Sequence, residues 1–292
     1  MTKKRNQHRR VLAAGVLAAA LFLGGCGGRK PADTAAGISY LESLEQRDPD
    51  AVDQVLRQRR LAELEAQREE LLRSIKAGEQ DPFTLFQDAV ILGDSRAVGF
   101  FYYGFVDESR NLTGTGDTIL NIPGKLDTLQ AMNPRYVYLT YGLNDIKIGH
   151  WATLEDHIES YMARVREIRE RLPDAVIVIS SVLPYHDPSA QSGTDTQGTE
   201  TPPTSSSSSS SGLTDADRRR LTQIPQWNEL MKATCEEFGV VFVDNSAICE
   251  EMKDLWESDG IHVKKNFYPD WGKNLVVAAL EEGGIVDEEA SA

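Results

Sequence analysis

The chain has 292 residues, of which 40% are hydrophobic, 26% charged and 8% aromatic, which is ordinary usage for a globular protein of one or two domains. This composition excludes a wholly disordered chain, a collagen-like repeat and a protein with several membrane spans. The formal net charge is −14, from 31 Lys and Arg against 45 Asp and Glu. So acidic a chain is not expected to bind nucleic acid, because surfaces that bind phosphates are basic.

The first 26 residues have the pattern of an export signal. Five basic residues precede an uncharged run from Val11 to Leu23, which is shorter than the about 20 apolar residues that a membrane-spanning helix needs. The run ends in Leu23-Gly24-Gly25-Cys26, which resembles the cleavage box of bacterial lipoproteins. The resemblance implies removal of residues 1–25 and a diacylglycerol on Cys26, which would hold the protein on the outer side of a cell membrane. An uncleaved N-terminal anchor is the alternative.

A tether and a long helix are predicted next. Residues 26–47 are predicted to be the tether, since they begin with small and polar residues. Residues 48–80 are predicted to form one charged amphipathic helix, with Asp48 as N-cap, Pro49 in the first turn and Gly78 just beyond the end. Its apolar stripe consists of Leu61, Leu64, Leu71, Leu72 and Ile75. The stripe is compatible with an oligomer formed through a coiled coil, but we favour a spacer helix that packs on the following domain or lifts it from the membrane.

From residue 81 to residue 287 the pattern is that of an α/β domain. Short apolar runs predict buried strands at Ala89–Leu92, Tyr136–Thr140, Ala175–Ser180 and Val240–Val243. Helices are predicted at Leu154–Arg171, Asp215–Phe238 and Asp270–Leu280. Strands that lack polar alternation and are separated by helices favour a central parallel sheet covered on both faces, which is a three-layer α/β/α sandwich. Such sheets gather active-site residues at the carboxyl ends of their strands.

One segment interrupts this domain. Residues 187–214 are rich in Ser, Thr, Gly and Pro and include seven consecutive serines from Ser205 to Ser211. We predict a disordered surface insertion, because the segment has almost no apolar side chains to offset the entropy of ordering. It follows a predicted strand and therefore lies at the edge of the sheet where the active site is expected. An inert insertion is favoured over one that screens the site.

Polar motifs stand where the predicted strands end. They are Gly93-Asp94-Ser95, the segment Asn111 to Thr118 with Gly114 and Gly116, Gly142-Leu143-Asn144-Asp145, and Asp259-Gly260-Ile261-His262. With these four motifs in this order, the chain resembles the SGNH (GDSL-type) hydrolase and esterase superfamily from about residue 88 to residue 283. The resemblance implies a flavodoxin-like fold and ester hydrolysis without a cofactor.

The resemblance also implies the roles of single residues. Ser95 is the expected nucleophile, with Asp259 and His262 completing a catalytic triad, and the donors of the oxyanion hole are expected to be Ser95, Gly116 and Asn144. The chemistry agrees, since a serine hydroxyl needs a base, imidazole is one near neutral pH, and a carboxylate orients the imidazole. Gly114 competes with Gly116 for its role, and His186 is a rival base at another strand end.

Two departures from the family bear on the substrate. Arg96 stands where the family's short name has Leu, and Trp271 belongs to an aromatic segment after His262. Both are candidate pocket residues, for an anionic or polyhydroxyl acceptor and for a sugar or acyl group, although a helix surface and core packing explain them as well. His150 and His157 are expected to be solvated. Paired Cys or His at ligand spacing are absent, so no metal is expected, and Cys235 and Cys249 are compatible with a disulfide or with two free thiols.

The sequence therefore predicts a lipid-anchored extracytoplasmic serine esterase that cleaves a small acyl ester, with acetyl on a carbohydrate as the favoured substrate. No long apolar lid suited to triglyceride is evident, which disfavours a lipase proper. One alternative is an O-acetyltransferase that passes the acyl group to a cell-wall or surface polysaccharide. A second alternative is a binding or assembly lipoprotein without catalytic activity.

Overall fold

A computed structural model describes residues 34–45, 48–186, 213–252 and 254–282. The predicted signal peptide at 1–25, the lipidation site Cys26 and the predicted insertion up to residue 212 lie outside the described residues. The chain divides into two units, residues 1–58 and residues 59–292. Within the described ranges, no helix combines the length and the apolar character needed to cross a membrane.

The first unit contains α2 (Ala35–Glu45) and the first turns of α3 (Pro49–Lys76). Helix α2 lies in the segment for which we predicted a tether, so the described part of that segment is helical, and the tether itself stays a prediction. The apolar side chains of Val52, Val55 and Leu56 on α3 are exposed. Oligomer formation through this helix likewise stays a prediction.

The long helix α3 begins and ends where the sequence predicted. The carboxylate of Asp48 accepts a hydrogen bond from the backbone N–H of Asp50 at 3.1 Å, and Pro49 is the first helical residue, where its missing N–H leaves no bond unmade. Gly78, just beyond the last turn, has φ +73°, a left-handed conformation that glycine adopts without strain.

The last turns of α3 belong to the second unit and pack in its core. Ile75 is fully buried in a core cluster to which Leu71 and Leu72 also contribute. Arg68 donates from Nη1 to the carbonyl oxygen of Leu280 at 2.9 Å. The second unit therefore begins before residue 81, where we predicted the domain boundary.

The second unit is built on a five-stranded parallel sheet. Its strands are β1 (Ala89–Gly93), β2 (Asn111–Thr113), β3 (Tyr136–Thr140), β4 (Val176–Ser180) and β5 (Val241–Val243). Their spatial order is β2-β1-β3-β4-β5, with every neighbouring pair parallel. The order reverses between β1 and β3, and such a reversal is where open α/β sheets place their sites. Four of the strands were predicted; β2 has only three half-buried residues and carries no apolar run.

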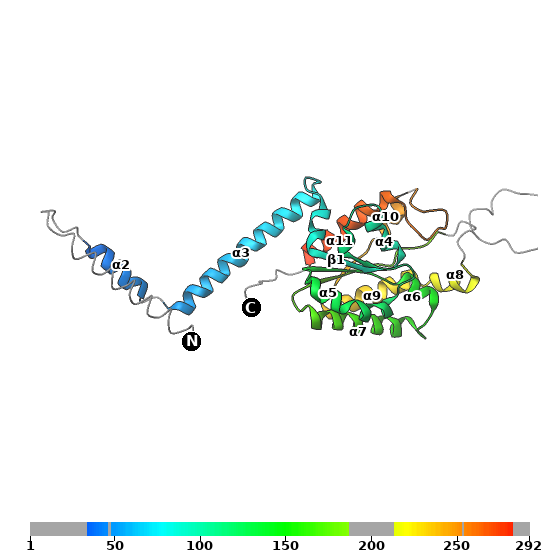
Figure 1. Ribbon diagram of the computed structural model, residues 1–292, viewed down its shortest axis with the longest axis horizontal. Helices are drawn as coiled ribbons and strands as arrows, with labels where there is room; N and C mark the ends of the chain where they lie inside the picture. Colours follow the sequence, from blue (N-terminus) through cyan, green and yellow to red (C-terminus); the bar gives the residue numbers. More distant parts are fainter. Residues whose placement is uncertain (1–33, 46–47, 187–212, 253, 283–292) are drawn as a thin grey trace, which may run out of the picture. The chain divides into compact units, whose positions relative to one another are not determined.

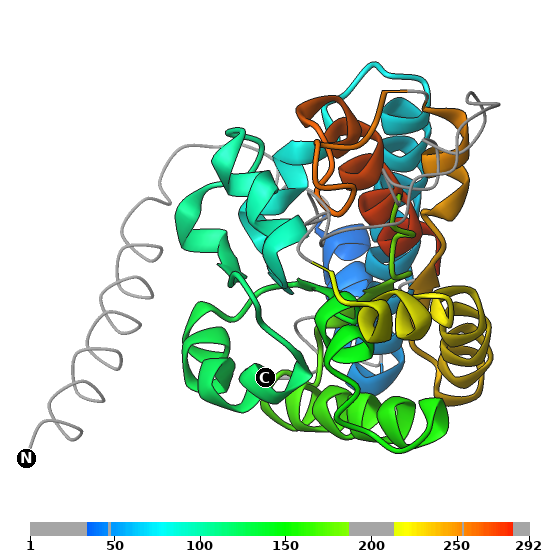
Figure 2. The same ribbon diagram turned by 90° about the vertical axis from the view of Figure 1, so that its right-hand side faces the viewer.

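Helices cover both faces of the sheet (Figure 1). The α-helices are α4 (Ser95–Tyr102), α5 (Leu126–Met132), α6 (Leu143–Ile148), α7 (Leu154–Arg171), α8 (Asp215–Leu221), α9 (Ile224–Phe238), α10 (Ser246–Glu251) and α11 (Tyr268–Glu282), and the 3₁₀ helices are η1 (Pro82–Asp88), η2 (Glu108–Arg110), η3 (Ile119–Lys125) and η5 (Lys265–Phe267). Helices α4, α10 and α11 lie on one face and α5, α7 and α9 on the other, and Figure 2 shows the same separation. The predicted three-layer α/β/α sandwich is confirmed.

Successive strand residues point to opposite faces of the sheet and join different core clusters. Val90 and Leu92 of β1 pack in the cluster that includes α7 and α9. Ala89 and Ile91 pack in the cluster that includes α11. All five residues of β1 are buried, which explains why this strand appears in the sequence as a continuous apolar run without polar alternation.

The prediction of one helix over Asp215–Phe238 was wrong, because the segment forms α8 and α9 with a break at Thr222 and Gln223. Pro225 explains the break. A proline has no N–H to donate to the carbonyl four residues earlier, and its ring clashes with that carbonyl, which here belongs to Leu221, the last residue of α8. In the first turn of α9 the same proline is accommodated.

Candidate active site

Ser95 is placed by the turn that joins β1 to α4. Asp94 caps α4, because its carboxylate accepts the backbone N–H of Arg96 at 3.0 Å, and Ser95 is the first helical residue and half-buried. Burial raises the pKa of Asp94 to about 6, against the charge and the N–H of Arg96, which act to lower it. The cap holds the hydroxyl at the carboxyl end of the strand.

His262 and Asp259 form a hydrogen-bonded chain with this hydroxyl. The Nε2 atom of His262 lies 2.9 Å from the Oγ atom of Ser95, and its Nδ1 atom lies 2.6 Å from Oδ2 of Asp259. An ionised carboxylate only accepts hydrogen bonds, so the ring proton of a neutral His262 belongs on Nδ1. The lone pair of Nε2 then faces the Ser95 hydroxyl and can accept its proton.

The carboxylate of Asp259 is held by the backbone of its own loop. Its Oδ1 atom accepts the N–H groups of Ile261 and His262, each at 2.9 Å. Partial burial acts to raise the pKa of Asp259, but the hydrogen bonds from the His262 ring, the His262 N–H and the Ile261 N–H together lower it below its ordinary value. Asp259 is therefore kept as the anion that orients and stabilises the imidazole.

Gly116 lies in a tight turn that follows β2. The N–H of Asp117 donates to the carbonyl of Gly114 at 3.2 Å and closes the Gly114–Asp117 turn. Gly116 has φ +81° at the third position of this turn, which is the position where a type II turn requires glycine. The N–H of Gly114 donates to the carbonyl of Gly93 at 3.1 Å. Because that N–H is already used, Gly116 is the better candidate of the two for an oxyanion donor.

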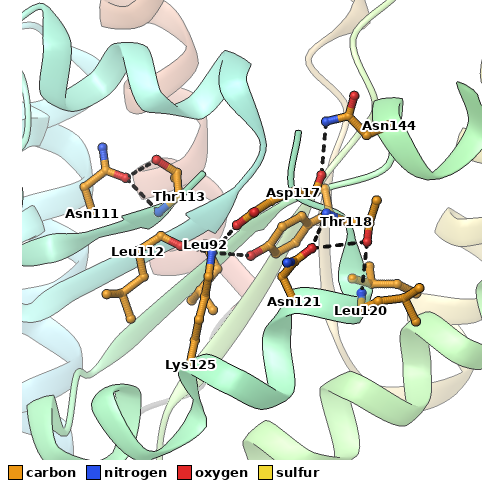
Figure 3. Close-up of polar contacts among 12 residues, drawn as sticks. Leu92, Asn111, Leu112, Thr113, Asp117, Thr118, Leu120, Asn121, Lys125 and Asn144 are labelled. Carbon is orange, nitrogen blue, oxygen red and sulfur yellow. Dashed lines mark hydrogen bonds and ion pairs between the residues drawn. The ribbon is translucent and has the colours of Figure 1, made fainter. Parts of the chain in front are cut away.

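Asn144 is oriented by the same turn (Figure 3). It is buried in the first turn of α6, and its Nδ2 atom donates to the carbonyl of Asp117 at 3.1 Å. A side-chain amide has two N–H bonds, so this contact uses one and fixes the direction of the other. Asn144 and the Gly116 turn are thereby coupled through one peptide carbonyl.

The structure thus brings together the residues that the four sequence motifs supply. Ser95, His262 and Asp259 are in direct contact, although 164 positions separate Ser95 from Asp259. His186 has a different place, since its backbone N–H donates to the carbonyl of Gly260 at 2.8 Å, while the hydroxyl of Ser95 is met by His262.

The sequence model of the GDSL-like lipase/acylhydrolase family matches residues 91–268, which include Ser95, Asn144 and the Asp259–His262 loop. The chain belongs to this family. The resemblance predicted from the sequence is confirmed at that level, and the protein is an acylhydrolase, an enzyme that cleaves ester bonds.

The acylhydrolase is also similar to solved structures. A GDSL-like lipase from Bacteroides thetaiotaomicron matches with 15% identity and a TM-score of 0.44, covering 75% of this chain and 99% of that one. A lipase/acylhydrolase from Enterococcus faecalis matches with 15% identity and a TM-score of 0.42, covering 66% and 95%. An acetylxylan esterase from Geobacillus stearothermophilus, a catalytic mutant, matches with 16% identity and a TM-score of 0.41, covering 68% and 94%. No curated protein matches the chain.

The prediction that Arg96 lines a substrate pocket was wrong. Its side chain is almost fully buried, with 2% exposure, and its donors are directed to backbone carbonyls. Nε donates to Ile261 at 2.8 Å, Nη1 to Leu183 at 2.6 Å and Nη2 to Pro184 at 2.9 Å. Since Ile261 precedes His262, the guanidinium joins the segment after β4 to the loop that carries the imidazole.

The corresponding prediction for Trp271 was also wrong. Its side chain is 2% exposed, packs against Phe100 with 4.9 Å between ring centroids, and donates from Nε1 to the hydroxyl of Ser180 at 3.1 Å. The aromatic segment after His262 belongs to the core between α11 and the sheet. A buried indole whose N–H is satisfied has no free face for a sugar or an acyl chain.

The side chain of His157 is not solvated, and neither Cys235 nor Cys249 is a reactive thiol. His157, which we expected to be solvated, is buried and accepts the indole N–H of Trp227 at 3.0 Å; His150 is exposed as expected. Cys235 and Cys249 are free thiols, and burial raises their pKa to about 12 and about 11, so both are protonated at neutral pH. In the part of the chain that the structure describes, no three His, Cys, Asp or Glu side chains gather as metal ligands would.

Several residues around the site were not singled out by the sequence. The cap formed by Asp94 has a local signal, because Asp before a helix is a common N-cap, and Gly-Asp-Ser contains it. Lys125 and Tyr141, whose side chains contact each other beside the Gly114–Asp117 turn, have no such signal. Their roles depend on contacts between segments, which spacing along the chain does not reveal.

Proposed function

We propose that this acylhydrolase is a lipid-anchored, extracytoplasmic serine esterase that removes a small acyl group from a carbohydrate ester. Acetyl is the favoured acyl group. Ser95 is the nucleophile, His262 the general base and acid, and Asp259 the residue that orients the imidazole. The hydrogen-bonded chain from Ser95 Oγ through His262 to Asp259 is the observation that carries the proposal.

Acylation begins with attack of Ser95 Oγ on the ester carbonyl carbon. The hydroxyl proton passes to Nε2 of His262, 2.9 Å away, and the imidazolium is stabilised by the Asp259 carboxylate. Negative charge develops on the former carbonyl oxygen, where the N–H groups of Ser95 and Gly116 and the second N–H of Asn144 receive it. One such donor contributes about 3 kcal/mol in the transition state. The tetrahedral intermediate then collapses, and His262 gives its proton to the departing alcohol oxygen.

Deacylation repeats these steps with water. His262 takes a proton from water, the hydroxide oxygen bonds to the acyl carbon, and the same donors hold the charge on the oxygen. Collapse breaks the bond to Ser95 Oγ, which recovers its proton from His262. The products are the carboxylic acid and the free enzyme, so no cofactor takes part.

The exposure of the imidazole favours a bulky alcohol. The side chain of His262 is 42% exposed and that of Asp259 33% exposed, so an oxygen on a large, hydrated substrate can reach the atom that must protonate it. The sequence contains no long apolar lid of the kind suited to triglyceride. A polysaccharide at the cell surface fits both features and the membrane attachment that Cys26 would provide.

The test uses the full chain in detergent with a panel of acetyl, butyryl and octanoyl esters and acetylated oligosaccharides. We expect hydrolysis of the acetyl esters, labelling of the wild type by a fluorophosphonate probe, and loss of both in Ser95→Ala. Ser109→Ala, which removes a hydroxyl from an exposed turn, is the control. Equal activity of wild type and Ser95→Ala, without labelling, would favour the binding lipoprotein.

A second arm separates hydrolysis from transfer. The acetyl donor is supplied with and without chito-oligosaccharide, and free acetate and acetylated sugar are both measured. Hydrolysis outpacing ester formation is expected; the reverse would establish an O-acetyltransferase. Cys26→Ala is expected to move the protein from the membrane fraction to the soluble extracytoplasmic fraction.

A further inference from the structure

The side chain of Lys125 makes polar contacts with three other residues (Figure 3). Its Nζ atom donates to the carbonyl of Leu112 at 2.6 Å and to the hydroxyl of Tyr141 at 3.2 Å, and it forms an ion pair with the carboxylate of Asp117. An ammonium group has three N–H bonds and no acceptor, so these three contacts use all its donors.

The three partners belong to three separate segments. Leu112 lies in β2, Asp117 closes the Gly114–Asp117 turn, and Tyr141 follows β3, two residues before the helix that begins with Leu143 and Asn144. One cation therefore ties together the chain segments that carry Gly116 and Asn144.

Asp117 transmits this contact to both proposed oxyanion donors. Its N–H closes the turn that contains Gly116, and its carbonyl accepts from Asn144. Its carboxylate fits against the turn because residue 114 is glycine, since a Cβ there would come within 2.5 Å of Oδ2 of Asp117. The side chains of Lys125 and Asp117 are only 20% and 17% exposed. Such an ion pair is less screened by water than a surface pair.

We propose that the Lys125–Asp117 ion pair positions the oxyanion hole, holding the Gly116 N–H and the Asn144 amide in the arrangement that the transition state requires. The inference rests on the proposed function. Lys125 is a positioning residue, because it acts through Asp117 and contacts no reacting atom. Without its charge, the Asp117 carboxylate loses its partner and turns toward water, and the turn and the Asn144 amide lose their common support.

The test compares full-length wild type, Lys125→Met, Asn144→Ala and the double variant on an acetyl ester. We expect Lys125→Met to lower kcat by about 10- to 100-fold, as misplacement of a reacting group by about 1 Å does, with KM changed less than about threefold. The inhibition constant of a trifluoromethyl ketone, which forms a tetrahedral adduct with Ser95, is expected to rise by the same factor as kcat falls.

The double variant separates positioning from general destabilisation. If Lys125 positions both Gly116 and Asn144, adding Lys125→Met to Asn144→Ala lowers kcat by a smaller factor than Lys125→Met does alone, because one of the two positioned donors is already absent. Lys125→Arg, which keeps the charge, is expected to recover part of kcat. Asp117→Asn breaks the pair from the other side and should give the same pattern, so the test survives if Lys125→Met does not fold. Lys232→Met on the exposed surface of α9 is the control.

Each outcome is decisive. Wild-type kcat in folded Lys125→Met, or full multiplication of the two effects in the double variant, would overturn the positioning role and leave the proposed function standing. Absence of Ser95-dependent hydrolysis in the wild type would instead overturn the proposed function, and this inference with it.

Discussion

The two sides of the site are held by different cations. On the side of the Ser95–His262–Asp259 chain, Arg96 donates to three backbone carbonyls, one of them in the Asp259–His262 loop. On the side of Gly116 and Asn144, Lys125 donates to a carbonyl, a hydroxyl and a carboxylate. Both cations join segments that are distant in the chain, but only Lys125 has an anionic hydrogen-bonding partner.

Because of this difference, we expect Arg96 to matter more for the stability of the fold and Lys125 more for the geometry of catalysis. Arg96 follows Ser95 in the first turn of α4 and also holds the loop that carries the base His262. Its side chain is almost fully buried, and so is its contact with the carbonyl of Leu183, where a lost donor is not replaced by water. Lys125 is partly exposed, so water can replace it in part. We therefore expect the loss of Arg96 to affect folding and the loss of Lys125 to affect mainly kcat.

The largest effect is expected on kcat, for the variant Asp259→Asn on the triad side of the site. An amide in place of the carboxylate favours the wrong imidazole tautomer, and kcat is expected to fall about 10⁴-fold with the loop intact. Removal of one oxyanion donor by Asn144→Ala should lower kcat by only about 10²- to 10³-fold, with KM less affected. Steady-state kinetics of both variants on one acetyl ester measures the ratio.

Asp254→Asn is the control for the triad side, because Asp254 pairs with Lys264 and its side chain is 87% exposed. Its kcat is expected within twofold of wild type. Should Asn144→Ala be slower than Asp259→Asn, the oxyanion side would be the more demanding of the two, and our ranking would be wrong.

The second effect concerns stability. Arg96→Met leaves one buried and two partly buried carbonyls without their donors, and the free energy of unfolding is expected to fall by about 3–5 kcal/mol. Lys125→Met is expected to lower it by only about 1 kcal/mol. Urea denaturation followed by tryptophan fluorescence measures both, with Arg171→Met, an exposed arginine paired with Asp127, as the control. Equal losses for Arg96→Met and Lys125→Met would remove the distinction between the two cations.

The sequence predicted the parts of the site that come as local motifs. Ser95, Asn144 and the Asp259–His262 loop follow strands, and parallel strands end at one edge of the sheet, so their meeting followed from topology. Arg96 and Trp271 were misplaced because their direction depends on packing. In a helix, a one-residue step rotates a side chain by about 100°, and Arg96 therefore points into the protein although Ser95 faces the site.

The fold shows the same limit. Apolar runs identified β1, β3, β4 and β5, whereas β2 was missed because its three residues are only half-buried. The break between α8 and α9 had a local signal in Pro225, which we overlooked. The three contacts of Lys125 had no local signal in the sequence. Its partners in β2, in the Gly114–Asp117 turn and just after β3 are brought together only by the folded sheet.

The smallest expected effect is a pH dependence of the free energy of unfolding, caused by Asp94 on the triad side. Asp94 caps the helix that carries Ser95 and Arg96, and its pKa is about 6 in the folded protein against an ordinary 3.8. Between these pH values the folded state keeps a proton that the unfolded chain releases. The free energy of unfolding should therefore fall as pH rises from about 4 to 6, by up to about 3 kcal/mol, and stay level above that. Asp94→Asn keeps the cap but does not titrate.

The measurement is the difference in unfolding free energy between Asp94→Asn and wild type from pH 4 to pH 7.5, in which titrations common to both proteins cancel. This difference should shift in favour of the variant as pH rises from about 4 to 6 and stay level above that. Asp107→Asn is the matched control, since Asp107 also caps a helix but is exposed and has a lowered pKa, so any trend runs in the opposite direction. A flat difference for Asp94→Asn would mean that the folded protein accommodates the Asp94 anion as easily as water does. The charge of Arg96 would then serve the nucleophile helix as well as the Asp259–His262 loop, and the triad side would resemble the oxyanion side in resting on an ion pair.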